Sequence, residues 1–254
     1  MQFYVESLRV SVFTGQFGDL RQVPIDEWWK RATGADPAQV TRNVAMAQLA
    51  AEGQFADGRL SVVVTPGRID WQVSSVPARA PEWPRLGPWP DYIPRLVNPV
   101  KDWLGSFGVT NRIAFGAVVV GIVDDRDTGY RAVEAALSDL GLKLPSLEVT
   151  DFLLQFNKPI DSREGPTGLL LNRLSRWSVA VLKPVIYQVM IGGAGAPPIP
   201  PEPTSHPDSH AVRVELDFST QADWSRQLTA EQGRSLLDEL VSRAIDYLKE
   251  RVKV

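Results

Sequence analysis

The sequence contains no cysteine and only two histidines, His206 and His210, in 254 residues. The missing cysteines exclude disulfides, thiol nucleophiles and thiolate-bound metals. Both histidines lie in a proline-rich stretch, so we expect neither of them on a regular core element. A serine nucleophile would have to recruit its base from that stretch, and no glycine-rich phosphate-binding motif is present. We therefore expect no cofactor and no ordinary nucleophilic active site.

The chain also lacks an excess of charge of one sign and a long hydrophobic run. Its 27 basic and 30 acidic residues give a net charge of −3, which produces no field that would gather nucleic acid or anionic lipid. The longest apolar run, residues 117–123, is far shorter than the roughly 20 residues that span a bilayer. The start of the chain has neither the basic nor the apolar segment of a signal peptide. We therefore expect a cytoplasmic protein that binds neither nucleic acid nor membrane.

Alternating apolar and polar residues predict strands in the first half. The clearest are residues 8–12, 60–64 and 69–73. The last two are separated by Thr65-Pro66-Gly67, whose backbone preferences favour a tight β-hairpin. Residues 112–123 are apolar on both faces, which predicts a central strand that is covered on both sides.

Helical spacing of apolar residues predicts three helices. The first covers residues 93–107, where Pro99 gives either a kink or a helix start. The second begins at an N-cap, Asp127 or Thr128, and ends at Gly141. The third occupies about the last 20 residues and begins at a capping box formed by Thr229 and Gln232.

The second half begins with further strands, at residues 149–157, 170–182 and 184–191. Residues 192–210 are rich in glycine and proline, which predicts a disordered loop. Residues 212–218 then alternate cleanly, with apolar side chains on one face and charged side chains on the other. The C-terminal helix follows this strand.

Together these elements predict an α+β fold of two mainly antiparallel sheet modules, each covered by one or more helices. The N-terminal module covers residues 1–145 and the C-terminal module covers residues 146–254. The dipeptide Asn-Arg opens a strand-like run in both, at residues 111–112 and 172–173. This repetition suggests a duplicated module, and chance explains a shared dipeptide equally well.

Two stretches of the second half carry a resemblance to a known family. They are LLLNRLSRWSVAV and VRVELDFSTQADWS, the latter followed by LLDELVSRAIDYLKE at the end of the chain. They resemble a sporadically distributed family of uncharacterised bacterial proteins of about this length. Because that family has no assigned activity, the resemblance implies an α+β fold and no mechanism. Its sporadic distribution implies an accessory component of a bacterial defence, immunity or mobile-element system.

The crossover at residues 76–99 provides the candidate binding surface. It holds seven prolines, and Trp83, Trp89 and Tyr92 lie among them. Aromatic rings on a stiff segment can stack on a ligand or anchor a protein partner, and arginines beside them complete the usual composition of an interface. The alternative is that both tryptophan rings fold back onto the sheet edge. The predicted binding residues are Trp83, Trp89, Tyr92, Arg85 and Arg95, and the expected partner is a protein or a second copy of the chain.

Two groups of metal-ligand residue types need a separate interpretation. Asp124, Asp125 and Asp127 follow the central strand, where they would suit a divalent-metal, carboxylate-dependent hydrolase, but a turn and a helix cap account for them as well. His206 and His210 would need a rigid scaffold to bind zinc, which the prolines around them do not offer. The leading hypothesis is therefore a non-catalytic binding protein without a metal site, and the hydrolase is the alternative.

Overall fold

Antiparallel strands dominate the computed structural model, which describes residues 1–15, 20–76, 82–141, 143–144, 151–182 and 208–252. They form an 11-stranded sheet in the order β2-β3-β4-β5-β1-β7-β11-β10-β8, with β6 beside β1 and β9 beside β10. The strands are β1 (Tyr4–Phe13), β2 (Gln39–Asn43), β3 (Gln48–Phe55), β4 (Gly58–Thr65), β5 (Arg68–Ser75), β6 (Gly87–Pro88), β7 (Arg112–Val123), β8 (Leu154–Asn157), β9 (Ile160–Asp161), β10 (Leu170–Leu182) and β11 (Ser209–Thr220). The helices are α1 (Ile25–Thr33), α2 (Ile93–Phe107), α3 (Arg126–Ala136) and α4 (Ala230–Arg251).

The α+β class is confirmed, but the strands build one sheet rather than two. The two predicted modules occupy opposite halves of this sheet, and they join where β7 pairs with β11, from Val123↔His210 to Ala114↔Ser219. A buried apolar strand such as β7 must pair its backbone on both sides, which it does with β1 and β11. The domain boundary at residue 145 stays a prediction.

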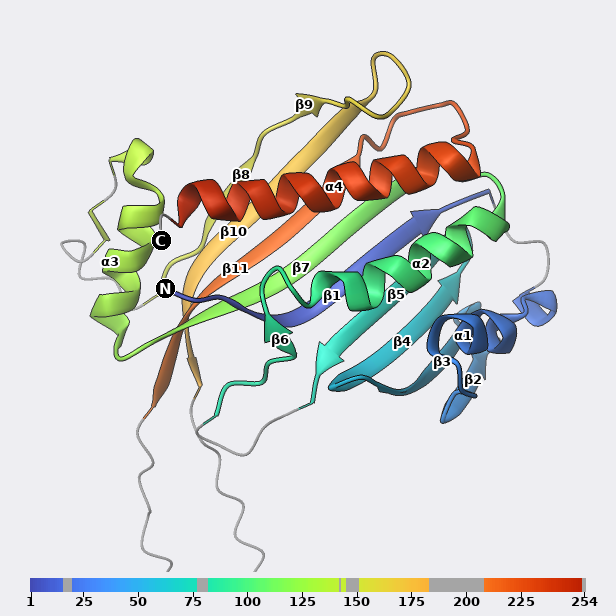
Figure 1. The fold of residues 1–254 in the computed structure, drawn as a ribbon, viewed down its shortest axis with the longest axis horizontal. Helices are drawn as coiled ribbons and strands as arrows, with labels where there is room; N and C mark the ends of the chain where they lie inside the picture. The colour runs from blue at the N-terminus through green and yellow to red at the C-terminus, as the bar shows by residue number, and fades with distance from the viewer. Residues whose placement is uncertain (16–19, 77–81, 142, 145–150, 183–207, 253–254) are drawn as a thin grey trace, which may run out of the picture.

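All four helices lie against the same face of the sheet. Figure 1 shows α1, α2 and α4 crossing the strands on one side, with α3 at the end where the two chain termini lie. The position of α3 follows from Gly129, where an added Cβ would come within 2.9 Å of Val179 and 3.5 Å of Val123. Among the described residues, the sheet therefore has one covered face, which holds the main core, and one face without helices.

The core on the covered face follows the alternation read from the sequence. Val212, Val214, Leu216 and Phe218 of β11 are buried there, as is the apolar stripe of α4. The largest fully buried side chains include four tryptophans, Trp29, Trp71, Trp103 and Trp177. Trp71 and Trp103 join β5 to α2 with their ring centroids 5.2 Å apart.

Several local predictions are confirmed because they rest on short-range geometry. β4 and β5 form the expected hairpin, and Gly67 has a positive φ of 78° in its turn. The capping box of α4 is present, with Thr229 Oγ1 accepting from the Gln232 amide at 3.2 Å. Strand β10 has the predicted limits. The strand predicted at residues 184–191 lies outside the described residues.

Other local predictions need correction. The N-cap of α3 is Asp125, not Asp127 or Thr128, because its Oδ1 accepts from the Thr128 amide at 2.7 Å. α3 ends at Ala136, and a 3-10 turn then leads to Gly141, which has a positive φ of 63°.

Two corrections concern strands, and one alternative is resolved. Of the predicted loop at residues 192–210, residues 192–207 lie outside the described part, but Ser209 and His210 belong to β11 because they pair with β10. β7 is covered only in part on its second face, where Ile122 is 44% exposed. α2 begins at Ile93 and continues through Pro99. Within the described residues, no helix combines the length and the apolar character needed to cross a membrane.

Candidate functional site

The face of the sheet opposite the helices, called the open face below, carries charged side chains from strands that are distant in sequence. At its centre Arg9 of β1 and Asp217 of β11 flank Gly116 of β7, and the register places all three side by side. Arg9 Nη2 lies 3.3 Å from Asp217 Oδ2. An added Cβ at Gly116 would come within 3.5 Å of the Arg9 guanidinium. The Arg9 guanidinium therefore lies directly over Gly116 and reaches the carboxylate on the next strand.

A second group of charges lies beside this pair and involves β1, β11 and β10. Arg213 Nε lies 3.3 Å from Glu6 Oε2, and its Nη1 also pairs with Glu215. Arg176 Nη1 approaches Glu215 Oε2 at 3.1 Å. Burial by itself raises the pKa of Glu215, but the hydrogen bond from Arg176 and the charge of Arg213 lower it overall. Glu215 therefore stays ionised at neutral pH.

An aromatic ring between two arginines marks one end of the open face. The guanidinium carbons of Arg68 and Arg112 lie 5.2 Å and 4.8 Å from the centre of the Phe13 ring. Arg68 pairs with Asp70 at 2.8 Å, and Arg112 donates to the backbone oxygen of Thr220 at 3.0 Å. These contacts hold the two guanidinium groups over the phenylalanine, in the geometry of a cation–π interaction.

A shallow groove of about 220 Å³ lies among the charged groups of the open face. Its lining includes Ser7, Gly116 and Val118 together with Arg9 and Arg176. Small side chains in the middle of the face therefore leave a depression that is bordered by arginines and by their carboxylate partners. The groove can receive a side chain or an extended segment of another molecule.

The first part of the crossover lies on the opposite end of the open face. Trp83 is only 8% exposed and packs on Val120 and Ala211, whose positions in the register place them on this face. Arg85 lies 4.5 Å from the centre of the Tyr4 ring. The Trp83 ring therefore folds back onto the sheet, as in the alternative interpretation, but it covers the central strands β7 and β11 rather than the sheet edge. Arg85 stays exposed.

The other predicted binding residues lie elsewhere. Trp89 lines an apolar pocket of about 460 Å³ that also includes Phe3 and Leu248, on the covered side of the sheet. Tyr92 is 3% exposed, and its pKa is raised first by burial and then by the nearby charge of Asp57.

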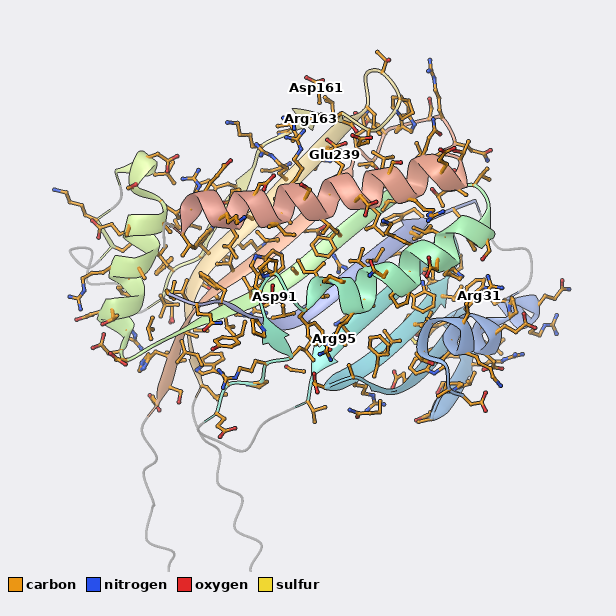
Figure 2. The ribbon with its side chains drawn as sticks, in the orientation of Figure 1. Arg31, Asp91, Arg95, Asp161, Arg163 and Glu239 are labelled. Carbon is orange, nitrogen blue, oxygen red and sulfur yellow. The ribbon has the colours of Figure 1, made fainter. Side chains whose placement is uncertain are left out.

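Arg95 forms an ion pair with Asp57 at 3.1 Å and lies 5.3 Å from the centre of the Tyr92 ring; Figure 2 shows it at the start of α2. The five predicted residues are thus divided among three places. Their role in binding stays a prediction, and the structure leaves little of Trp83 or Tyr92 for a partner to touch.

The alternation of residues 8–12 and 212–218 puts Arg9, Arg213, Glu215 and Asp217 on the polar faces of their strands, but it does not group them into a site. The sequence shows which side chains of each alternating strand are charged. It does not show the strand order that brings these charges together, since Arg9 and Asp217 are 208 residues apart. A composite surface of this kind appears only once the sheet is assembled.

The residues considered for the alternative metal site do not converge. Asp124, Asp125 and Asp127 are exposed, and Asp125 is engaged as the cap of α3. Asp208 and His210 are described, whereas His206 lies outside the described residues. No group of three histidine, aspartate or glutamate side chains suited to a metal ion occurs in the part of the chain that the structure describes.

A buried carboxylate on the covered face has a different arrangement. Glu239 of α4 is 6% exposed and accepts hydrogen bonds from Ser162 Oγ at 2.7 Å and from the amides of Arg163 and Glu164 at 3.0 Å. Arg243, one turn later, lies 3.1 Å from its Oε1. Figure 2 shows Arg163 close to Glu239 above α4. All these contacts are internal, so Glu239 serves to fasten the loop after β9 to the helix.

Comparisons with protein-family models, with curated proteins and with solved structures give no match. The function must therefore be argued from the residues of the open face. These residues can form ion pairs, stack on aromatic rings and accept a chain in the groove. In the described part of the face, no group of three histidine, aspartate or glutamate side chains is arranged to hold a metal ion.

Proposed function

We propose that this protein is a non-catalytic binding protein that uses the open face of its sheet to hold a protein partner. The observation that carries the proposal is the band of ion pairs across β5, β1, β7, β11 and β10, with the groove over Gly116 in its middle. Antiparallel sheets often leave one face to water. The half-buried arginines and the groove at Gly116 give this face a shape that a protein partner can recognise.

The balance of charge favours a protein over a nucleic acid. Arg9, Arg68, Arg176 and Arg213 each have a carboxylate partner on the same face, so most of its positive charge is already neutralised. Two other arginines described there, Arg85 and Arg112, lie over aromatic rings. A partner with both signs of charge can exchange ion pairs with such a surface and thereby gain specificity. Arginine and aromatic residues, which occur together around Phe13, are enriched in the centres of protein interfaces.

The cellular setting follows from the sequence and belongs to the same proposal. We place the protein in the cytoplasm, as an accessory component of a bacterial defence, immunity or mobile-element system. The resemblance to a sporadically distributed bacterial family supports this setting. The neighbouring genes in the source genome test it, because an accessory component should lie beside the genes of the system that it serves.

A matched pair of variants tests the binding surface. Arg9→Ser with Arg176→Ser removes two arginines from the open face, while Lys101→Ser with Arg234→Ser removes two cations from the helix side. Both changes affect partly exposed side chains, so each ion pair lost should cost less than about 1 kcal/mol of stability.

Each protein is used to capture partners from an extract of the cells that encode it, and the captured proteins are quantified by mass spectrometry. We expect a partner that the wild type and the helix-side variant retain and that the open-face variant loses at least about tenfold. Equal retention by all three proteins would contradict the proposal, and so would capture of nucleic acid in place of a protein.

A further inference from the structure

Strand β2 is the last strand at one end of the sheet, and its side chains are exposed to solvent. Among the described residues it pairs only with β3, from Gln39↔Glu52 to Asn43↔Gln48, and all five of its residues are exposed. Within the part of the chain that the structure describes, its outer edge therefore presents unpaired backbone donors and acceptors. Such an edge is a template for another strand unless the protein blocks it.

The usual means of blocking an edge are largely missing from β2. The strand contains no proline and a single charge, Arg42, which forms no ion pair within the described part of the chain. The hairpin turn that follows exposes Val44 to 91% and Met46 to 68%, and Val40 within the strand is 39% exposed. Three of the ten exposed large hydrophobic side chains among the described residues are thus gathered in this short segment.

The sequence of β2 is compatible with pairing to its own copy. If two β2 strands meet antiparallel with Thr41 opposite Thr41, Val40 lies opposite Arg42 of the second copy, and Gln39 lies opposite Asn43. No like charges face each other directly, and a threonine pair is favourable in this position. The same register places Val44 beside Ala38 of the second copy, so the apolar tip of each hairpin meets an apolar residue.

We propose that two copies of this chain associate through β2 into one continuous antiparallel sheet, with a two-fold axis that passes between the two Thr41 residues. This axis is perpendicular to the sheet, so the helix layers of both copies lie on one side and both open faces lie on the other. The proposal is independent of the partner-binding function proposed above, because β2 lies at the far end of the sheet from the β11–β10 part of the open face.

Charge variants test the register. In Val40→Lys each lysine faces Arg42 of the second copy, whereas in Val40→Glu each glutamate faces that arginine. Light scattering after size exclusion should show a dimer for the wild type, a dimer dissociation constant raised about tenfold for Val40→Lys, and a tighter dimer for Val40→Glu. The double variant Val40→Lys/Arg42→Glu restores opposite charges across the axis and should restore dimerisation. Circular dichroism of each variant confirms that the monomer is folded.

The lack of cysteine allows a second, independent test. In Thr41→Cys the only two thiols of the dimer lie across the axis, with Cα atoms about 4.5–5.5 Å apart, inside the range that a disulfide spans. Mild oxidation should convert most of this variant to a covalent dimer on a non-reducing gel. Gln54→Cys, at an exposed position of the neighbouring strand β3, is the control and should remain mostly monomeric.

Three outcomes would overturn the proposal. The first is a wild type that stays monomeric at about 100 µM, well above the dissociation constants of ordinary specific interfaces. The second is a dimer that responds equally to Val40→Lys and Val40→Glu. The third is a dimer that dissociates in the variant with Arg9→Ser and Arg176→Ser but not in Val40→Lys, which would move the interface to the open face.

Discussion

The hydroxyl of Tyr247 on α4 accepts a hydrogen bond from the indole Nε1 of Trp177 on β10 at a distance of 3.1 Å. The same oxygen lies 2.7 Å from Ser175 Oγ. Trp177 has no exposed surface, and Ser175 is 1% exposed. The Tyr247 hydroxyl thus provides a hydrogen-bond partner for two buried polar groups, and it links the end of α4 to β10.

We predict that Tyr247→Phe destabilises the protein by about 1–3 kcal/mol, because the indole N–H of Trp177 then stays buried without an acceptor. Urea unfolding followed by tryptophan fluorescence measures the change. Tyr4→Phe is the matched control, since its hydroxyl bonds only to an exposed Gln2 side chain in the described structure. It should change stability by less than about 0.5 kcal/mol. Equal effects of the two changes would show that the buried network contributes nothing specific.

A second prediction concerns Glu239 and its dependence on pH. Burial raises the pKa of this carboxyl, but hydrogen bonds from Ser162, Arg163, Glu164 and Arg243 lower it overall from 4.5. A lowered pKa in the folded protein means that the ionised group stabilises the fold above its unfolded pKa, and that this contribution is lost as the pH falls through the folded value.

We therefore expect Glu239→Gln to cost about 1.5–3 kcal/mol at pH 7, the range for hydrogen bonds to a charged group. The difference from the wild type should shrink as the pH falls below 4.5. Urea titrations between about pH 3 and pH 7 measure it. Asp238→Asn, one residue away, breaks only the partly exposed pair with Lys101 and should change stability by less than about 1 kcal/mol. A loss for Glu239→Gln that does not vary with pH would contradict the electrostatic explanation.

A third prediction tests how firmly α4 is docked. Leu240 has no exposed surface and belongs to the main core. Leu240→Ala should cost about 2–5 kcal/mol, as the removal of a fully buried leucine side chain does. Leu140→Ala, at a position that is 43% exposed, serves as the control with an expected change near zero. A loss below about 0.5 kcal/mol for Leu240→Ala would mean that the helix packs loosely on the sheet.

The fourth prediction separates the two tryptophans of the crossover. Trp83→Ala should destabilise the protein by roughly 3 kcal/mol, because this ring covers Val120 and Ala211 on the open face. The neighbouring Glu82→Ala, at an exposed position, should be nearly neutral. Thermal unfolding of both variants decides the matter. An unchanged melting temperature for Trp83→Ala would show that the ring does not stabilise the fold, and Trp83 would then remain a candidate binding residue.

What could be predicted from the sequence depends on the range of the interactions involved. The β4–β5 hairpin and the capping box of α4 follow from residues within a few positions of each other, such as Pro66-Gly67 and Thr229 with Gln232. β2 and β3 gave no prediction, because β2 is exposed at every position and therefore has no alternation of apolar and polar residues. A strand with no buried position leaves no such pattern in the sequence.

The pairing of the two modules and the make-up of the open face depend on contacts between residues that are far apart in the sequence. The sequence shows that residues 112–123 are apolar, but not that they pair with β1 and β11 together. Arg9 and Asp217 become neighbours only through this strand order. Periodicity specifies which face of a strand is charged, and topology decides which charges meet.

The place of β1 inside the sheet has a consequence for synthesis of the chain. Val12 pairs with Ile113, about a hundred residues later, and β7 in turn pairs with β11 near the end of the chain. Ribosomes add roughly 5–20 residues per second, so β1 emerges about 5–20 s before β7 exists to pair with it. During this interval its apolar residues have no strand on that side. We expect the yield of native protein in cells to depend on translation speed and on chaperones that shield the nascent N-terminal strands.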